Sequence, residues 1–108
     1  MARYLIIQSR CSFGASEADF CRDLARRLAT ADNRVTLFLV QNGVLPARAA
    51  AQGPGFADLA RIGVEILADD FSLRERGISS DRLQPGVTPS ALDVVIDCLA
   101  DGAKAIWH

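Results

Sequence analysis

Three short runs of apolar, β-prone residues constrain the fold of this chain more than any other feature. They are Arg3–Gln8, Val35–Val40 and Val64–Ala68. Each is apolar for most of its length, so each is expected to be a strand covered on both faces. Helical patterns separate the runs, as connections between parallel strands require. The sequence therefore predicts a parallel sheet between two layers of helices.

The connecting segments carry signals for the starts and ends of helices. Ser16 is a good N-cap, and the acids that follow it favour the positive end of a helix dipole. Pro46 suits the first turn of another helix. Gly77 is expected to close a short helix that begins after the third run. Before the final helix, helices are predicted from Ser16 to near Asp32, over Ala47–Gln52, over Phe56–Ile62, and from Asp70 to Gly77.

The last part of the chain is predicted to be a loop, a helix and a strand. Ser79–Val87 has the least pattern and is expected to be a mobile loop. Thr88 is a suitable N-cap, Pro89 a suitable first helical residue, and Gly102 ends the helix. Ala103–His108 then forms a terminal strand. The apolar face of this helix is expected to hold Leu92, Val94, Val95, Ile96, Cys98 and Leu99.

These elements predict one α/β domain over residues 1–108. Its architecture is expected to be a three-layer sandwich with a mostly parallel, flavodoxin-like sheet of four to five strands and helices on both faces. A chain of 108 residues suffices for one compact domain and is too short for two. A sheet with so few strands leaves helical and edge surface that an oligomer could bury.

Composition and charge exclude several classes of partner and cofactor. A formal net charge of −1 and the absence of basic clusters argue against a nucleic-acid or membrane partner. No signal peptide or membrane span is recognisable. The three cysteines, Cys11, Cys21 and Cys98, fit no zinc-binding pattern, and no motif for any other metal or cofactor is present. The simplest expectation is a reduced cytoplasmic protein without a cofactor, with Cys21 and Cys98 as small core residues.

Two acids mark a candidate site where the third strand ends. In an open parallel sheet, ligands bind beyond the carboxyl ends of the strands. Asp69 and Asp70 lie at this junction and could serve as a general base and its neighbour, or as polar contacts to a ligand. They could instead cap the helix that follows, because its dipole stabilises acids by about 0.3–1 kcal/mol. Capping is the favoured alternative.

The loop after the first strand holds a candidate nucleophile. Cys11 lies beside Arg10 and near a helix N-terminus, both of which lower the pKa of a thiol. Arg10 and Ser12 are candidate ligand contacts in the same loop. The loop lacks the residues of a phosphate-binding Walker motif or a dinucleotide fingerprint. An unreactive loop cysteine is the simpler interpretation.

Other candidates also follow strands. Asn42 and Gly43 could offer an amide and a close backbone approach to a ligand, or could be ordinary turn residues. His108 would reach the same edge of the sheet if the last strand is parallel, although a frayed terminus is the simpler expectation. Trp107 is expected to pack at the sheet edge or in a subunit interface.

The chain resembles the DsrE/DsrF-like family of small α/β proteins of sulfur metabolism, which includes subunits of TusBCD-type sulfur relays. The resemblance covers nearly the whole chain in element order. It is sharpest over Leu59–Ala68 and Leu73–Ile78, and it extends to Phe38–Val44 and Gly102–Trp107. The resemblance implies a homo-oligomer, a trimer or hexamer, or an assembly with sulfur-relay partner subunits.

The resemblance also exposes a departure at the candidate site. Sulfur-carrying members place a cysteine directly after the strand equivalent to Val64–Ala68, and this chain has Asp69 there. A thiolate can hold sulfur as a persulfide, whereas a carboxylate cannot. The expectation is therefore a non-catalytic binding or scaffold subunit. The alternative is a sulfur carrier or small enzyme that uses Cys11 with Arg10 and Asp69.

Overall fold

The computed structural model describes residues 1–10, 16–51 and 55–108, with the backbone alone for 16–19. Five strands form one sheet in the order β4-β3-β2-β1-β5, and every pairing is parallel. The strands are β1 (Arg3–Gln8), β2 (Arg34–Leu39), β3 (Glu65–Asp69), β4 (Val87–Ser90) and β5 (Lys104–Trp107). The α-helices are α1 (Ser16–Thr30), α2 (Ala57–Arg61), α3 (Asp70–Glu75) and α4 (Asp93–Ala100). Two 3-10 helices, η1 (Gln41–Ala47) and η2 (Ser80–Arg82), complete the described elements.

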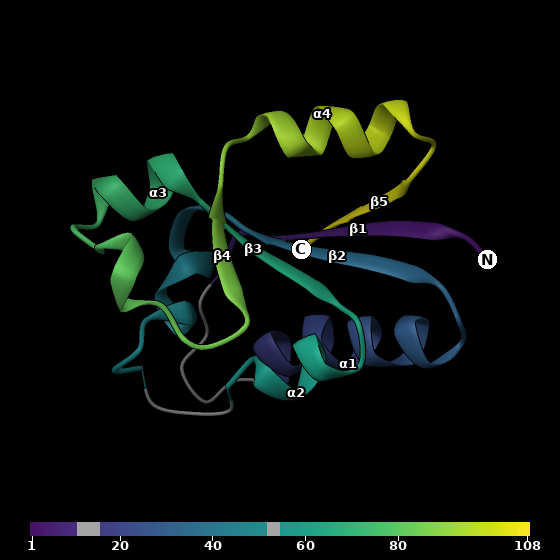
Figure 1. The fold of residues 1–108 in the computed structure, drawn as a ribbon, viewed down its shortest axis with the longest axis horizontal. Coiled ribbons are helices and arrows are strands. Elements are labelled where there is room, and N and C mark those ends of the chain that lie inside the picture. The colour runs from purple at the N-terminus through teal and green to yellow at the C-terminus, as the bar shows by residue number, and fades with distance from the viewer. Residues whose placement is uncertain (11–15, 52–54) are drawn as a thin grey trace.

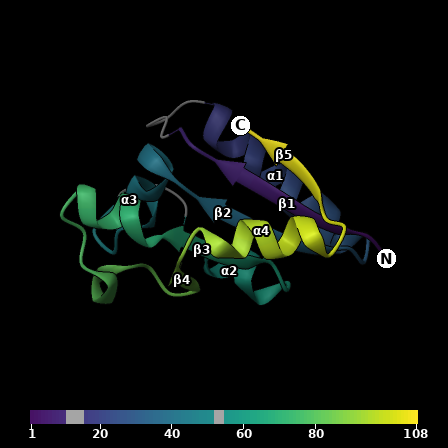
Figure 2. The same cartoon turned by 90° about the horizontal axis from the view of Figure 1, so that it is seen from above.

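Helices lie on both faces of the sheet, so the predicted three-layer sandwich is confirmed. Helices α1 and α2 lie along one face, and α4 lies along the other (Figure 1). Seen from above, α4 crosses the strands and β5 lies at one margin of the sheet (Figure 2). The chain steps from β1 to β4 in one direction and then returns through α4 to β5. Right-handed crossovers place helices on opposite faces when the direction of travel reverses.

The two faces of the sheet account for the strands being apolar throughout. Neighbouring residues of a strand point to opposite faces. In β1, Ile6 belongs to the larger core beneath α1 and α2, whereas Leu5 and Ile7 belong to a smaller core beneath α4. Both cores therefore draw on the same strands. The smaller core consists of Leu5, Ile7, Phe38, Leu67 and Cys98.

The start of the final helix differs from the prediction. Thr88 and Pro89 do not open a helix but belong to β4, which pairs in parallel with β3. Pro89 lacks a backbone N–H, and this is tolerated because β4 lies at the edge of the sheet. Helix α4 begins at Asp93 and ends just before Gly102, which has a positive φ.

The segment after Pro46 also differs from the prediction. Pro46 lies inside η1, and Arg48 is extended, so no helix begins at Ala47. The backbone here pairs with residues 82–84: Ala49 N donates to Arg82 O at 2.8 Å, and Gln84 N donates to Ala47 O at 2.8 Å. These long-range bonds replace the helix that local propensity favours.

The same bonds hold part of the segment predicted to be a mobile loop. Within Ser79–Val87, residues 80–82 form η2 and Val87 opens β4. Gln84 also donates through its side-chain nitrogen to Pro46 O at 2.7 Å. The segment is therefore an ordered link between α3 and β4. Within the described part of the chain, the helices are too short or too polar to span a bilayer.

Candidate functional site

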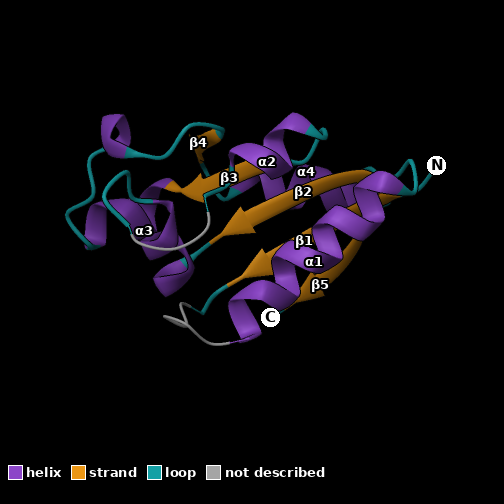
Figure 3. Cartoon of the chain, turned by 90° about the horizontal axis from the view of Figure 1, so that it is seen from below, coloured by secondary structure: helices purple, strands orange, loops and turns teal. Residues whose placement is uncertain are grey.

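The strands end together along one edge of the sheet, which we call the carboxyl rim. The arrowheads of β1, β2 and β3 point the same way, toward the end of the molecule that holds α3 (Figure 3). The register places Gln8 opposite Leu39, and Asp69 opposite Ser90. Of these rim residues, Asp69 carries the one acidic side chain, and the sequence had marked it as a candidate.

Asp69 caps α3, and the residue is 5% exposed. Its Oδ2 accepts one hydrogen bond from Ser72 N at 3.0 Å and another from Ser72 Oγ at 2.7 Å. This satisfies one of the backbone N–H groups that the start of a helix leaves without a partner. Asp69 therefore caps the helix through Oδ2, which is the interpretation that the sequence favoured.

Ser72 extends this contact to the neighbouring strand. Its Oγ accepts a hydrogen bond from Gln41 N at 2.8 Å, at the start of η1. One turn later, Arg76 donates to Asn42 Oδ1 from Nε and from Nη2, both at 3.1 Å. The segments that follow β2 and β3 are thus tied together by polar side chains. Sequence reasoning missed Ser72 and Arg76, although a serine three residues after a capping acid is a local signal for the first contact.

Gly43 provides a close backbone approach, but to the protein itself. A Cβ at this position would lie 2.1 Å from Gln8 O, which is backbone at the end of β1. No side chain fits there without displacement of η1. The amide of Asn42 is occupied by Arg76, as described above. In the described part of the structure, Gly43 and Asn42 therefore serve the packing and hydrogen bonding of the rim itself.

A cavity of about 250 Å³ opens beside Asp69. It lies at the carboxyl end of β3, between α3 and the residues that lead into α4. Asp69 and Asp70 lie on its wall together with apolar side chains and a single arginine. The six lining residues are Asp69, Asp70, Phe71, Arg74, Ala91 and Leu92. The structure therefore brings two of the predicted site residues together in one cavity.

The other predicted site residues belong to the end of β1. Arg10 is exposed, and its backbone oxygen accepts a hydrogen bond from Gln8 Nε2 at 3.2 Å. Cys11 and Ser12 lie outside the described residues. The strand order reverses between β1 and β5, and such a reversal is where ligands commonly bind in open α/β sheets.

His108 lies beside this reversal and is not frayed. Its backbone continues the pairing of β5 with β1, because His108 N donates to Ile7 O at 2.8 Å and its oxygen accepts from Ser9 N at 2.9 Å. The ring packs against Phe20, with the two ring centroids 5.0 Å apart. Its buried Nε2 has no hydrogen-bond partner among the described residues. Trp107 is exposed at the sheet edge and donates from Nε1 to Ser9 Oγ at 3.2 Å.

The two described cysteines are buried and not disulfide-bonded, as predicted for core residues. Burial raises the pKa of the Cys21 thiol, which keeps it protonated and unreactive.

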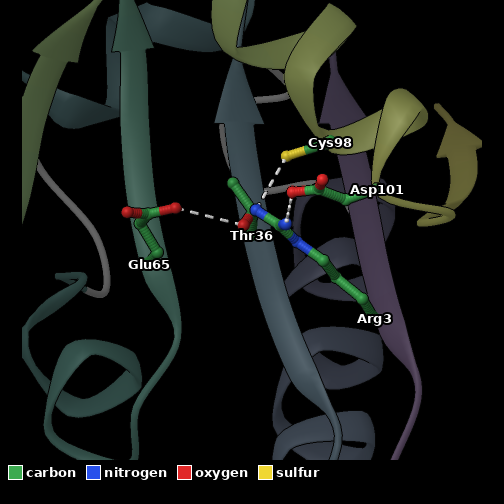
Figure 4. Close-up of polar contacts among 5 residues, drawn as sticks. All are labelled: Arg3, Thr36, Glu65, Cys98 and Asp101. Atoms are coloured by element: carbon green, nitrogen blue, oxygen red, sulfur yellow. Dashed lines mark hydrogen bonds and ion pairs between the residues drawn. The ribbon is translucent and has the colours of Figure 1, made fainter.

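Figure 4 shows Cys98 at the amino end of the sheet, where Arg3 donates to Cys98 Sγ at 3.3 Å and to Asp101 Oδ2 at 2.7 Å. These contacts attach the end of α4 to β1. Across the same end of the sheet, Thr36 and Glu65 share a hydrogen bond of 3.2 Å.

Among the residues that the structure describes, no group of three histidine, cysteine or acidic side chains is placed to hold a metal ion. The fold and the rim define a small, all-parallel α/β sandwich with a polar site at the carboxyl ends of its strands.

Comparisons with known proteins agree with this class. A protein of unknown function, MTH1491 from Methanobacterium thermoautotrophicum, has a similar structure, with a TM-score of 0.81 and 19% identity over 100% of both chains. The ychN protein from E. coli gives a TM-score of 0.74 and 18% identity over 100% of both chains. BT1422 from Bacteroides thetaiotaomicron, of unknown function, gives 0.67 and 14% identity over 97% of this chain and 94% of that one. Among curated proteins, no sequence matches this chain.

The family model for the DsrE/DsrF-like family matches residues 2–107. The chain therefore belongs to the DsrE/DsrF-like family, and the resemblance seen in the sequence is confirmed. The three structural likenesses, at 14–19% identity, support the fold.

Proposed function

We propose that this protein is a non-catalytic binding or scaffold subunit associated with sulfur metabolism. The observation that supports this most is the state of Asp69. It occupies the position at which sulfur-carrying members of the family have cysteine, and its Oδ2 is committed to capping α3 through Ser72. The side chain therefore contributes to the structure of the rim.

The chemistry of a carboxylate at position 69 also argues against a sulfur carrier. A sulfur carrier must attack sulfane sulfur and hold it reversibly through an S–S bond. A carboxylate forms no such bond. The two described thiols are buried within the two cores, away from a sulfur donor. A role in binding or assembly does not require the Asp69 carboxylate or the two described thiols to react.

Intact-mass measurement after incubation with a persulfide donor tests the proposal. The protein is expected to keep its original mass, because its β3 position offers no thiol. Reduced and alkylated samples serve as controls for adventitious adducts. Retention of one sulfur atom on a cysteine, reversed by a reductant, would overturn the proposal.

A second candidate function is a sulfur carrier or small enzyme that uses Cys11 with Arg10 and Asp69. The reversal of strand order between β1 and β5 favours it, because the segment that contains Arg10 and Cys11 follows β1 directly. Labelling the native protein with a thiol reagent across a range of pH separates the two functions. Fast labelling of Cys11 with a depressed pKa would support the carrier, whereas slow labelling with an ordinary thiol pKa would remove its main argument.

For the binding role we propose self-assembly into a trimer or hexamer, or assembly with sulfur-relay partner subunits, in the reducing cytoplasm. Three exposed apolar residues support assembly: Leu92 directly before α4, and Ile96 and Leu99 on it. Leu92 is 57% exposed, Ile96 65% and Leu99 50%. They recur at spacings of four and three, so they share one side of the helix. Contiguous exposed apolar residues of this kind are typical of interaction surfaces.

A further inference from the structure

A second cavity, of about 230 Å³, lies between the segments that follow η1 and α3. Residues 48–50 come directly after η1, residues 77–79 follow α3, and Arg82 ends η2. This cavity shares no lining residue with the one beside Asp69. Among the described residues, its wall carries two arginines, Arg48 and Arg82, and no acid.

Long-range hydrogen bonds fix the backbone from which the two arginines extend. Ala49 N donates to Arg82 O at 2.8 Å, and Arg48 pairs with Leu83 in an antiparallel bridge. The side chain of Gln84 donates to Arg48 O at 3.2 Å. Two segments that are far apart in the sequence are thus held together, and each brings one arginine to the same cavity.

Several hydrogen-bond donors on this wall have no acceptor in the protein. Arg48 is half-buried, and its Nε donates to Leu45 O at 2.9 Å. Its two terminal nitrogens and the guanidinium of Arg82 form no hydrogen bond or ion pair with the described residues. The backbone N–H groups of Ala50 and Ser79 also donate to none of the described residues. These donors are available to a ligand that brings acceptor oxygens.

The charges on the wall select an anion. Two guanidiniums give this small cavity a positive charge that no carboxylate on its described wall offsets. Within the described residues, the neighbouring Asp81 accepts a hydrogen bond from Ser79 Oγ and forms no ion pair with either arginine. The planar fork of a guanidinium matches the two oxygens of a carboxylate, so it binds this group with good geometry.

Apolar side chains complete the wall and select the rest of the ligand. They belong to Ala49, Ala50 and the half-buried Ile78. A short hydrocarbon chain can be buried against them, and each buried methylene group strengthens binding about fourfold. The volume of about 230 Å³ is smaller than that of pockets for drug-sized ligands, which hold roughly 300–1,000 Å³. The guest is therefore a small molecule or a single side chain.

We propose that this cavity binds a carboxylate on a short apolar chain. The carboxylate oxygens accept hydrogen bonds from Arg48 and Arg82, and the chain lies against Ala49, Ala50 and Ile78. Such a group occurs in free short-chain carboxylic acids and in the acidic side chains of a partner protein. The inference goes beyond the proposed function, because neither the role of the rim nor assembly through α4 requires this site.

NMR titration of the full 15N-labelled chain at constant ionic strength tests the proposal. The probes are butyrate, its neutral isostere butyramide, the cation butylammonium, inorganic phosphate, and formate, a carboxylate without the hydrocarbon chain. Butyrate is expected to shift the amide signals of Ala49, Ala50 and Ser79 saturably. It should bind at least about tenfold more tightly than butyramide, as a charge-assisted hydrogen bond implies. Formate should bind at least about tenfold more weakly than butyrate, because it buries no methylene group.

Variants then locate the charge. Arg82→Gln should weaken butyrate binding at least about fivefold, the loss of one charged hydrogen bond, and leave butyramide binding unchanged. Arg82 is exposed and holds Ala49 through its backbone oxygen, so this variant should fold. Arg48→Lys keeps the charge without the planar fork and should weaken binding less than Arg48→Gln. Arg61→Gln is the matched control, because Arg61 is exposed on α2 and does not line the cavity. If the Arg48 variants do not fold, Arg82→Gln still decides.

A capped Ala-Glu-Ala peptide distinguishes the two sources of the carboxylate. If the natural guest is a partner's side chain, the peptide should bind more tightly than butyrate. If the guest is a free acid, the peptide should bind no more tightly. Both results support a carboxylate site.

Five results would overturn the proposal: no saturable shift at the cavity, equal binding of butyrate and butyramide, tighter binding of butylammonium or phosphate than of butyrate, formate binding as tight as that of butyrate, or no loss in Arg82→Gln. None of them bears on sulfur retention or on oligomeric state, so the proposed function would be judged separately.

Discussion

In the proposed function, Asp69 takes the place of the cysteine that the resemblance to sulfur-carrying proteins implies. Its side chain lies at the end of β3 and joins that strand to α3 through Ser72. Ser72 in turn joins α3 to the backbone of Gln41. A cysteine in place of Asp69 would offer only a weak sulfur acceptor to these donors. Asp69→Cys would therefore be expected to change the hydrogen bonding of the rim as well as its chemistry.

Replacing Asp69 by Ala should lower the free energy of unfolding by about 1–2 kcal/mol, the usual cost of a lost N-cap acceptor. Asp69→Asn should cost less, because its amide oxygen can still accept. Asp70→Ala is the matched control, since Asp70 loses only its interaction with the helix dipole, worth about 0.3–1 kcal/mol. Denaturant unfolding measures all three, and an equal loss in Asp69→Ala and Asp70→Ala would contradict the capping role.

Gly43 is expected to be among the least replaceable residues of the rim. In Gly43→Ala the new Cβ would lie 2.1 Å from Gln8 O, so η1 or β1 must move. Overpacking of this kind costs about 1–3 kcal/mol. Gly55→Ala is the milder control, because its Cβ would meet a side-chain atom, Gln84 Oε1, at 3.1 Å and no backbone atom. Thermal unfolding should show a clear loss for the first variant and little change for the second.

Among the elements, α4 shows how much a pattern can predict and where it stops. The sequence indicated a helix with apolar residues around much of its circumference. In the structure Cys98 is buried and Val94 and Val95 pack against the smaller core, whereas Ile96 points outward. Periodicity found the helix but could not say which apolar side faces the sheet. The exposed apolar residues on the outer side of α4 are the ones that the proposed assembly would cover.

Replacing an exposed apolar residue of α4 tests the proposed assembly through this helix. Ile96→Arg, at a residue that is 65% exposed, should leave the fold intact and reduce the sedimenting species toward the monomer. Ile62→Arg is the control, since Ile62 is 41% exposed and follows α2 on the other face of the sheet. Analytical ultracentrifugation at micromolar concentration measures both. A wild-type monomer, or dissociation by Ile62→Arg alone, would contradict assembly through α4.

Two further elements mark the limit of local sequence patterns. Thr88 and Pro89 have the signature of a helix start, yet they pair with β3 as an edge strand. Helix propensity after Pro46 is overridden by hydrogen bonds to residues more than thirty positions away. Both errors come from contacts that no local window contains. The apolar strands and most α-helices, by contrast, could be predicted because burial on both faces fixes their composition.

For the whole molecule, the parallel sheet and its rim followed from the alternation of strands and helices, and family membership is confirmed. The candidate site was only partly predictable. The sequence marked Asp69 and Asp70 because they end a strand, and these two line one cavity. It could not reveal Phe71, Arg74 and Leu92 beside them, since three-dimensional packing joins α3 to the start of α4.

The proposed function requires that the end of β3 carries no sulfur. The most direct measurement compares the wild-type protein with Asp69→Cys after incubation with a persulfide donor, using intact mass and peptide mapping. We expect the wild type to gain no sulfur and the variant to gain one sulfur atom on the new cysteine. Retention of sulfur by the wild-type protein on Cys11, with no further gain in the variant, would contradict it.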